Sequence, residues 1–178
     1  MCQHARVPTS SRADHRVDLE RLRLGRLARL QHAMRDHDVD VLVLANEPNV
    51  RYATGATAMP VYAMSTFARC AVVPQQGTPI LFEHANSVHR SRLRASDVRP
   101  MHAWEFYDDP APQAGIWADE TLAAARELGA SGERIAVDRL GTPAFLALLD
   151  RGARLVDSAP VTRRPDGSRP PRRSSCST

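Results

Sequence analysis

Apolar residues recur at helical spacing in the first predicted element, which covers about residues 18–37. Asp18 precedes this stretch as an N-cap. With successive residues placed about 100° apart, one broad arc holds most of the apolar side chains: Leu19, Leu22, Leu27, Leu30, Ala33 and Met34. Arg23 and Arg26 interrupt the arc, so their aliphatic stems must lie along the apolar side while their charges reach water. The pattern predicts an imperfect amphipathic helix.

A short apolar run follows and predicts a strand. Residues 39–45 read VDVLVLA, and from Val41 onward the run no longer alternates with polar residues. Such runs are typical of parallel strands that helices cover on both faces. Two more strands are expected at residues 69–74 and 79–83. The four residues between them predict a hairpin turn in which Gly77 takes a positive φ.

The second half of the chain alternates helices with strands. We expect a weak helix at 87–94, a strand at 98–104, a helix at 113–128, a strand at 134–138, a helix at 142–151 and a last strand at 153–156. Gly129 and Gly152 are expected to end the two longer helices, and Thr142 to cap the second of them before Pro143. Because one antiparallel hairpin is inserted into this alternation, the sequence predicts an α/β fold with a mixed β-sheet flanked by helices.

The charged residues are unevenly placed along the chain. There are 24 arginines, no lysine and 20 acidic residues, which makes the formal charge +4. Residues 161–178 hold five arginines and one acid, so the other 160 residues are balanced at 19 arginines and 19 acids. A nucleic-acid-binding protein needs its positive charge clustered on a folded face. We therefore expect no nucleic-acid partner, and we attribute the absence of lysine to GC-rich coding rather than to any one site.

Composition suggests three segments and a cytoplasmic location. We expect a flexible leader at residues 1–17, a folded domain at 18–161, and a disordered tail rich in Arg, Pro and Ser at 162–178. The longest apolar run has six residues, too few to span a membrane, and the first residues lack the apolar core of a secretory signal. Cys2, Cys70 and Cys176 are scattered and predict neither a disulfide framework nor a CxxC metal site.

A search for catalytic or metal-binding patterns identifies no active site. Residues 36–40 read DHDVD but lack the glycine turn and final glutamate of a calcium loop, so we interpret them as a solvated turn. His84 and His89 do not have the spacing of a zinc helix. His102 is interpreted as a partly buried, hydrogen-bonded histidine rather than a catalytic base. Cys70 lies inside an apolar strand with no base nearby in the sequence, so it is not a candidate nucleophile. Asp108 and Asp109 precede a proline and predict a loop. No GxSxG, GxGxxG or GxxxxGK motif is present, and the missing glycine loop argues against a nucleotide-binding module.

One segment is more specific. Residues 47–55 read EPNVRYATG directly after the first predicted strand. From the residues alone, Pro48 should hold Glu47 extended, Asn49 can cap a short turn, and Gly55 lets the chain reverse. This reading is a strand-to-turn connection and no more.

The same segment resembles the signature of the N-terminal domain shared by creatinase, aminopeptidase P and Xaa-Pro dipeptidases, the pita-bread metallohydrolases. The signature positions are Asn49, Arg51, Tyr52, Thr54 and Gly55. The order of predicted elements from Leu19 to Arg164 is similar as well. Residues 51–54, together with Arg69 and residues 135–138, are especially similar to the dimethylsulfoniopropionate lyase-like branch. The resemblance implies a creatinase-N-like fold with Rossmann- or ribonuclease H-like layering.

The resemblance also implies that the chemistry lies elsewhere. In this family a following catalytic domain uses two Asp, one His and two Glu to bind a pair of divalent metal ions, and none of those positions occurs in these 178 residues. We therefore expect a non-catalytic domain with no cofactor of its own. The composition of 162–178 suggests a truncated or frameshifted linker. The alternative is an oligomerisation or assembly module that pairs with itself or with a full-length relative.

A loop after the signature carries the remaining candidate residues. In the family, loops at this place can reach over the active site of a neighbouring subunit. The matching residues are Met59, Tyr62, Met64, Phe67 and Arg69. They are interpreted either as lid residues or as a plain apolar loop or interface, and the sequence leaves both readings open.

Overall fold

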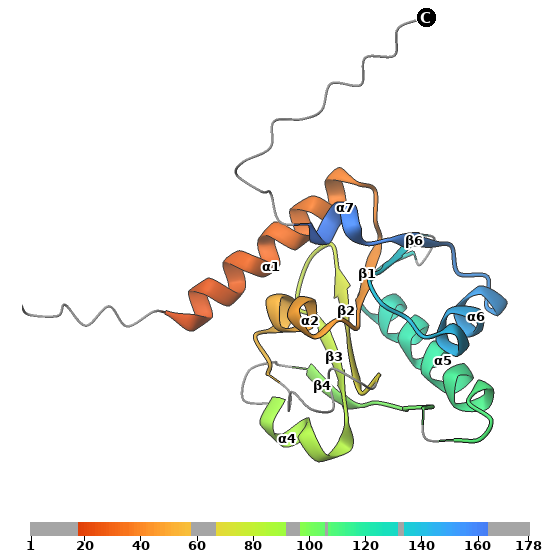
Figure 1. The fold of residues 1–178 in the computed structure, drawn as a ribbon. Helices are drawn as coiled ribbons and strands as arrows, with labels where there is room; N and C mark the ends of the chain where they lie inside the picture. Colours follow the sequence, from red (N-terminus) through yellow and green to blue (C-terminus); the bar gives the residue numbers. More distant parts are fainter. Residues whose placement is uncertain (1–17, 58–66, 92–96, 106, 132–133, 164–178) are drawn as a thin grey trace, which may run out of the picture.

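The computed structural model describes residues 18–57, 67–91, 97–105, 107–131 and 134–163 (Figure 1). Six strands form one sheet in the order β4-β3-β2-β1-β5-β6. The strands are β1 (Val41–Leu44), β2 (Arg69–Pro74), β3 (Ile80–Glu83), β4 (Asp97–Pro100), β5 (Ile135–Val137) and β6 (Leu155–Asp157). β1 and β2, and likewise β2 and β3, are antiparallel, whereas the remaining neighbours are parallel, so β2 alone runs against the other five. The expected mixed sheet is confirmed.

Helices cover both faces of this sheet. They are α1 (Leu19–Asp36), α2 (Glu47–Thr54), the 3-10 turn η1 (Ala85–Ser87), α4 (Val88–Ser91), α5 (Ala111–Glu127), α6 (Thr142–Asp150) and α7 (Ala159–Thr162). Figure 1 shows α1, α2 and α7 on one side of the sheet and α5 and α6 on the other.

Each face of the sheet has its own apolar core, because side chains alternate along a strand. Val41 and Val43 of β1 pack with α5 and α6, whereas Leu42 and Leu44 pack with α1 and α2. Only the inner stripe of α1 is buried, at Leu27, Leu30 and Met34. Burial on both faces explains why β1 reads as an uninterrupted apolar run.

The signature segment differs from its sequence prediction. Residues 47–54 form the helix α2, not an extended residue followed by a turn. The extended residue is Asn46, at φ −72° and ψ 120°, and Pro48 lies in the first helical turn. Proline is well tolerated there, because the first amide hydrogens of a helix have no partner within it. Gly55 ends α2 at φ +75°, the left-handed conformation that glycine adopts readily.

Several boundaries also shift. Thr142 is the first residue of α6 and Gly141 is its N-cap. β4 stops at Pro100 instead of reaching Trp104. The weak helix is split into η1 and α4, while residues 92–94 lie outside the described part. α7 was not predicted, because only four residues form it and Val161 alone is buried. The hairpin turn at Gly77, with φ +88°, is confirmed.

The expected leader at 1–17 and most of the expected tail at 162–178 lie outside the described residues, so those boundaries stay predictions. Within the described ranges, no helix combines the length and apolar character that a membrane crossing requires.

Candidate functional site

The signature helix α2 is held at its beginning by a carboxylate from a distant strand. Asp138 follows β5 directly, and β5 pairs in parallel with β1, which leads into α2. Asp138 Oδ1 accepts hydrogen bonds from the backbone amides of Ala45 at 2.7 Å and Asn46 at 3.2 Å. Its Oδ2 accepts one from Asn49 Nδ2 at 3.0 Å. Asp138 thus anchors the two residues that lead into α2 and the Asn49 side chain in its first turn, and its negative charge suits the N-terminal end of the helix dipole.

The other signature residues also serve the local fold. Tyr52 Oη accepts a hydrogen bond from Arg29 Nε at 3.2 Å, and the Arg26 guanidinium lies 5.6 Å from the centre of its ring. Thr54 Oγ1 donates to the carbonyl of Val50 at 2.8 Å and accepts from the amide of Ala56 at 3.1 Å. These contacts fix the orientation of α1 against α2 and the end of α2.

Two signature positions remain. Arg51 is exposed on α2. A Cβ at Gly55 would lie 3.0 Å from Cδ of Arg23, so a side chain there would need both a positive φ and a shift of Arg23. The five signature residues therefore do not converge on one cavity.

Arg69 forms a buried ionic cluster with two glutamates. Its side chain is 2% exposed, with Nη1 3.0 Å from Glu47 Oε2 and Nη2 2.9 Å from Glu83 Oε2. Glu83 is equally buried and also accepts a hydrogen bond from Ser91 Oγ at 2.6 Å. The cluster joins α2, β2, β3 and α4 with one cation between two carboxylates. Sequence reasoning singled out Arg69 but not its partners, because Glu47 and Glu83 lie far from it along the chain.

Phe67 is buried in an aromatic cluster. Its ring centroid lies 4.5 Å from that of Trp104 and 5.5 Å from that of Trp117, the second contact being edge-on. Its backbone amide donates to Glu105 Oε2 at 2.6 Å. The other candidates of the loop, Met59, Tyr62 and Met64, lie outside the described residues.

The thiol of Cys70 is enclosed by the same core. Trp117 Nε1 donates to its Sγ at 3.4 Å, and burial raises the pKa of Cys70 to about 12. Because the thiolate is the nucleophile, this thiol is unsuited to covalent catalysis at neutral pH.

The histidine and acidic candidates are dispersed. His102 contacts Glu120 at 2.8 Å but is 47% exposed, so its expected partial burial is wrong. His84 accepts a hydrogen bond from the amide of Asn86 and caps η1. Asp40 accepts from Ser131 Oγ and the amide of Arg134. In the described part of the chain, no three His, Cys, Asp or Glu side chains gather closely enough to hold a metal ion.

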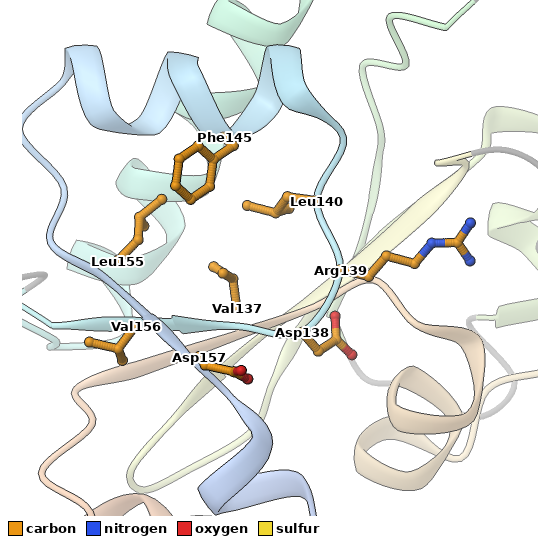
Figure 2. A pocket seen from close by; sticks show the side chains of 8 residues that line it. All are labelled: Val137, Asp138, Arg139, Leu140, Phe145, Leu155, Val156 and Asp157. Atoms are coloured by element: carbon orange, nitrogen blue, oxygen red, sulfur yellow. The ribbon is translucent and has the colours of Figure 1, made fainter.

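A groove lies where β5 and β6 end beneath α6, and we call it the α6 groove (Figure 2). Its volume is about 330 Å³, and its lining comprises Val137, Asp138, Arg139, Leu140, Phe145, Leu155, Val156 and Asp157. Figure 2 shows Phe145 reaching from α6 toward Leu140, Leu155 and Val137, while Arg139 points away from them. This groove was not predicted from the sequence, although the apolar run at residues 144–149 exceeds what one buried helix face needs.

The fold is similar to solved structures of prolidase-type proteins. An Xaa-Pro dipeptidase from Bacillus anthracis matches 78% of this chain and 34% of its own, at 15% identity and a TM-score of 0.56. The isolated creatinase/prolidase N-terminal domain of an Xaa-Pro dipeptidase from Streptococcus pyogenes matches 76% of this chain and 95% of its own, at 14% identity and a TM-score of 0.52. At these identities the likeness concerns the fold alone.

A characterised relative and a family model extend the similarity to sequence. The dimethylsulfoniopropionate lyase DddP of Roseovarius nubinhibens is 28% identical over 153 residues, which cover 83% of this chain and 34% of the lyase. The chain thus spans about a third of the length of that lyase. The model of the Creatinase/Prolidase N-terminal domain matches residues 26–165, and this chain therefore belongs to that family.

Proposed function

We propose that these 178 residues act as a non-catalytic N-terminal domain that serves a metal-dependent catalytic domain of the creatinase and prolidase type. The family match over residues 26–165 carries this proposal. The relatives named above include a dimethylsulfoniopropionate lyase and Xaa-Pro dipeptidases, so the reaction served is a lyase or peptidase reaction on a small substrate. The 28% identity to the lyase favours the lyase branch.

The way the polar residues are used supports a structural role. Asp138 is engaged by two backbone amides and by Asn49. Arg69 is enclosed between Glu47 and Glu83. Asp138 and Arg69 thus hold elements of the fold together, which is what a structural role requires.

A direct assay tests the proposal. The purified chain is incubated with Mn²⁺, Zn²⁺ or Fe²⁺ and offered an Xaa-Pro dipeptide, creatine or dimethylsulfoniopropionate. We expect no turnover of any substrate with any metal. Metal-dependent turnover that co-elutes with the folded chain would overturn the proposal. A full-length lyase or dipeptidase assayed in parallel shows that each assay works.

The second candidate function is assembly, with another copy of the chain or with a full-length relative. The supporting observation is a set of large apolar side chains left exposed on α6 and α5, among them Phe145, Leu146, Leu149 and Ile116. Exposed apolar residues that gather in one place commonly mark an interface.

A further inference from the structure

Two arginines of α1 meet at one tyrosine of α2. The Arg26 guanidinium lies 5.6 Å from the centre of the Tyr52 ring, and Arg29 Nε donates to Tyr52 Oη at 3.2 Å. Arg26 is half-buried and Arg29 is exposed. Because the two arginines are three residues apart on one helix, their side chains are neighbours on its surface. Tyr52 therefore holds two cationic groups close together where α1 and α2 meet.

The protein does not neutralise these two cations. Within the ranges that the structure describes, no carboxylate forms an ion pair with Arg26 or Arg29. The acidic side chains of the two helices and of the α1 N-cap have other partners: Asp18 the amide of Arg21, Glu20 Arg23, Asp36 His32, and Glu47 Arg69. Like charges at this spacing on a helix repel each other. A bound anion would remove that repulsion.

The N–H donors that remain indicate the chemistry of the anion. Arg29 uses Nε on Tyr52, so its Nη groups stay available, and Arg26 contacts the face of the ring rather than a hydrogen-bond acceptor. Guanidinium groups bind carboxylates and phosphates through pairs of N–H donors. A carboxylate carries one charge, whereas a phosphate monoester carries about −1.5 to −2 at pH 7 and presents three oxygens. Two guanidinium groups therefore match a phosphate in charge and in acceptors.

Apolar side chains continue the same stripe of α1. Leu19 and Leu22 precede Arg26 and Arg29 at spacings of three and four residues, which places all four on one side of the helix. Leu19 is 57% exposed and Leu22 is 37% exposed. An apolar chain attached to the phosphate can lie along these leucines. The same phosphate chemistry can therefore come from a lipid headgroup or from a free phosphate compound.

We propose that Arg26 and Arg29, positioned by Tyr52, form a binding site for a phosphate group. The site lies on the α1 and α2 side of the sheet, opposite α5 and α6 (Figure 1). It goes beyond the role proposed above and does not depend on whether the chain is catalytic.

NMR spectra of the arginine side chains test the site directly. Inorganic phosphate is added to the purified chain at constant ionic strength. The Nε–H signals of Arg26 and Arg29 are expected to shift and to saturate at about 1–10 mM phosphate. Acetate, which carries one charge, should bind about tenfold more weakly or less. Shifts of the same size with chloride, or equally tight binding of acetate, would overturn the proposal.

Matched substitutions locate the site. Arg26→Gln and Arg29→Gln each remove one cation and are expected to weaken phosphate binding about fivefold or more. Arg21→Gln is the control, because Arg21 is exposed on α1 but lies about 140° around the helix from Arg26. Circular dichroism checks each fold, and either site variant repeats the test if the other fails to fold. Phosphate binding that both site variants retain, or that Arg21→Gln weakens equally, overturns the proposal.

Vesicles identify the source of the phosphate. The chain is sedimented with phosphatidylcholine vesicles that contain or lack phosphatidic acid. Sedimentation that requires both phosphatidic acid and Arg29 assigns the site to a lipid headgroup. Phosphate binding without such sedimentation assigns it to a free phosphate compound, and the absence of binding in both experiments overturns the proposal. Neither experiment measures turnover, so this proposal and the proposed function can fail separately.

Discussion

Asp138 and Asn49 are 89 residues apart in the sequence, and Asn49 Nδ2 donates a hydrogen bond to Asp138 Oδ2 at 3.0 Å. The two residues belong to the two segments that carry the family resemblance, residues 47–55 and 135–138. The parallel pairing of β1 with β5 brings the two segments together, because the carboxyl ends of both strands lie at the same edge of the sheet. The segments that looked like separate motifs in the sequence form one structural unit.

Asp138→Asn is expected to lower the free energy of unfolding by about 1–3 kcal/mol, because an amide group replaces one of two oxygens that accept hydrogen bonds from N–H donors. Denaturant unfolding followed by circular dichroism measures the change. Asp108→Asn, in an exposed loop, is the matched control and should have little effect. Equal stability of the two variants would contradict the anchoring role of Asp138.

Arg69→Met is expected to destabilise the protein by about 3–5 kcal/mol, because Glu83 would stay buried without its cation. The same unfolding experiment measures this loss. Adding Glu83→Gln to Arg69→Met should restore part of the stability, since the uncompensated buried charge is then removed. Arg99→Met is the control: Arg99 pairs with Asp97 and Glu127 at the surface, where such pairs contribute up to about 1 kcal/mol. Similar losses for both arginines would argue against the buried cluster.

Replacing threonine by valine should change the stability of the protein in opposite directions at two buried positions. Thr121 Oγ1 is buried without a hydrogen-bond partner, whereas Thr54 Oγ1 both donates and accepts. Thr121→Val keeps the shape and removes an unsatisfied polar group, so it should stabilise the protein by about 1 kcal/mol. Thr54→Val should destabilise it by about 1–2 kcal/mol. Thermal unfolding of the two variants is the measurement, and a shift in the same direction for both would refute the assignment.

Cys70 is expected to resist thiol reagents while the protein is folded. The experiment uses a variant with Cys2→Ser and Cys176→Ser, in which Cys70 is the remaining thiol. At about pH 8 labelling should be slow in buffer and immediate in denaturant, because burial keeps the thiol protonated. Rapid labelling in buffer would show that the apolar core around Cys70 on β2 opens readily in the folded protein.

The raised pKa of Cys70 also affects stability. Its value of about 12 in the folded state exceeds the ordinary value near 9. The unfolded chain therefore loses this proton first as the pH rises. The stability that the protonated Cys70 thiol contributes is fully present below about pH 9, and it is lost as the pH rises toward 12. In a Cys70→Ala variant of the same protein, the part of the fall in the free energy of unfolding at alkaline pH that comes from this thiol should be absent.

Local patterns predicted most of the elements correctly. The long helices, the hairpin at Gly77 and the mixed sheet follow from apolar spacing and from glycine positions, which act over a few residues. The local prediction for the signature was wrong, because Pro48 was expected to hold Glu47 extended, although proline also fits the first turn of a helix. α7 gave too little pattern to be predicted, and the strand β4 was predicted but ends at Pro100 instead of Trp104.

The sequence by itself determined where most of the helices and strands lie, that the sheet is mixed, and which family the chain resembles. Backbone periodicity and turn chemistry are local, so they can be read along the chain. Only the tertiary structure decided that Asp138 anchors the start of α2, that Glu47 and Glu83 enclose Arg69, and that Phe145 and Leu155 line one groove. Each of these contacts joins residues from different elements. Their partners depend on strand order and register, which the packing of the whole domain sets.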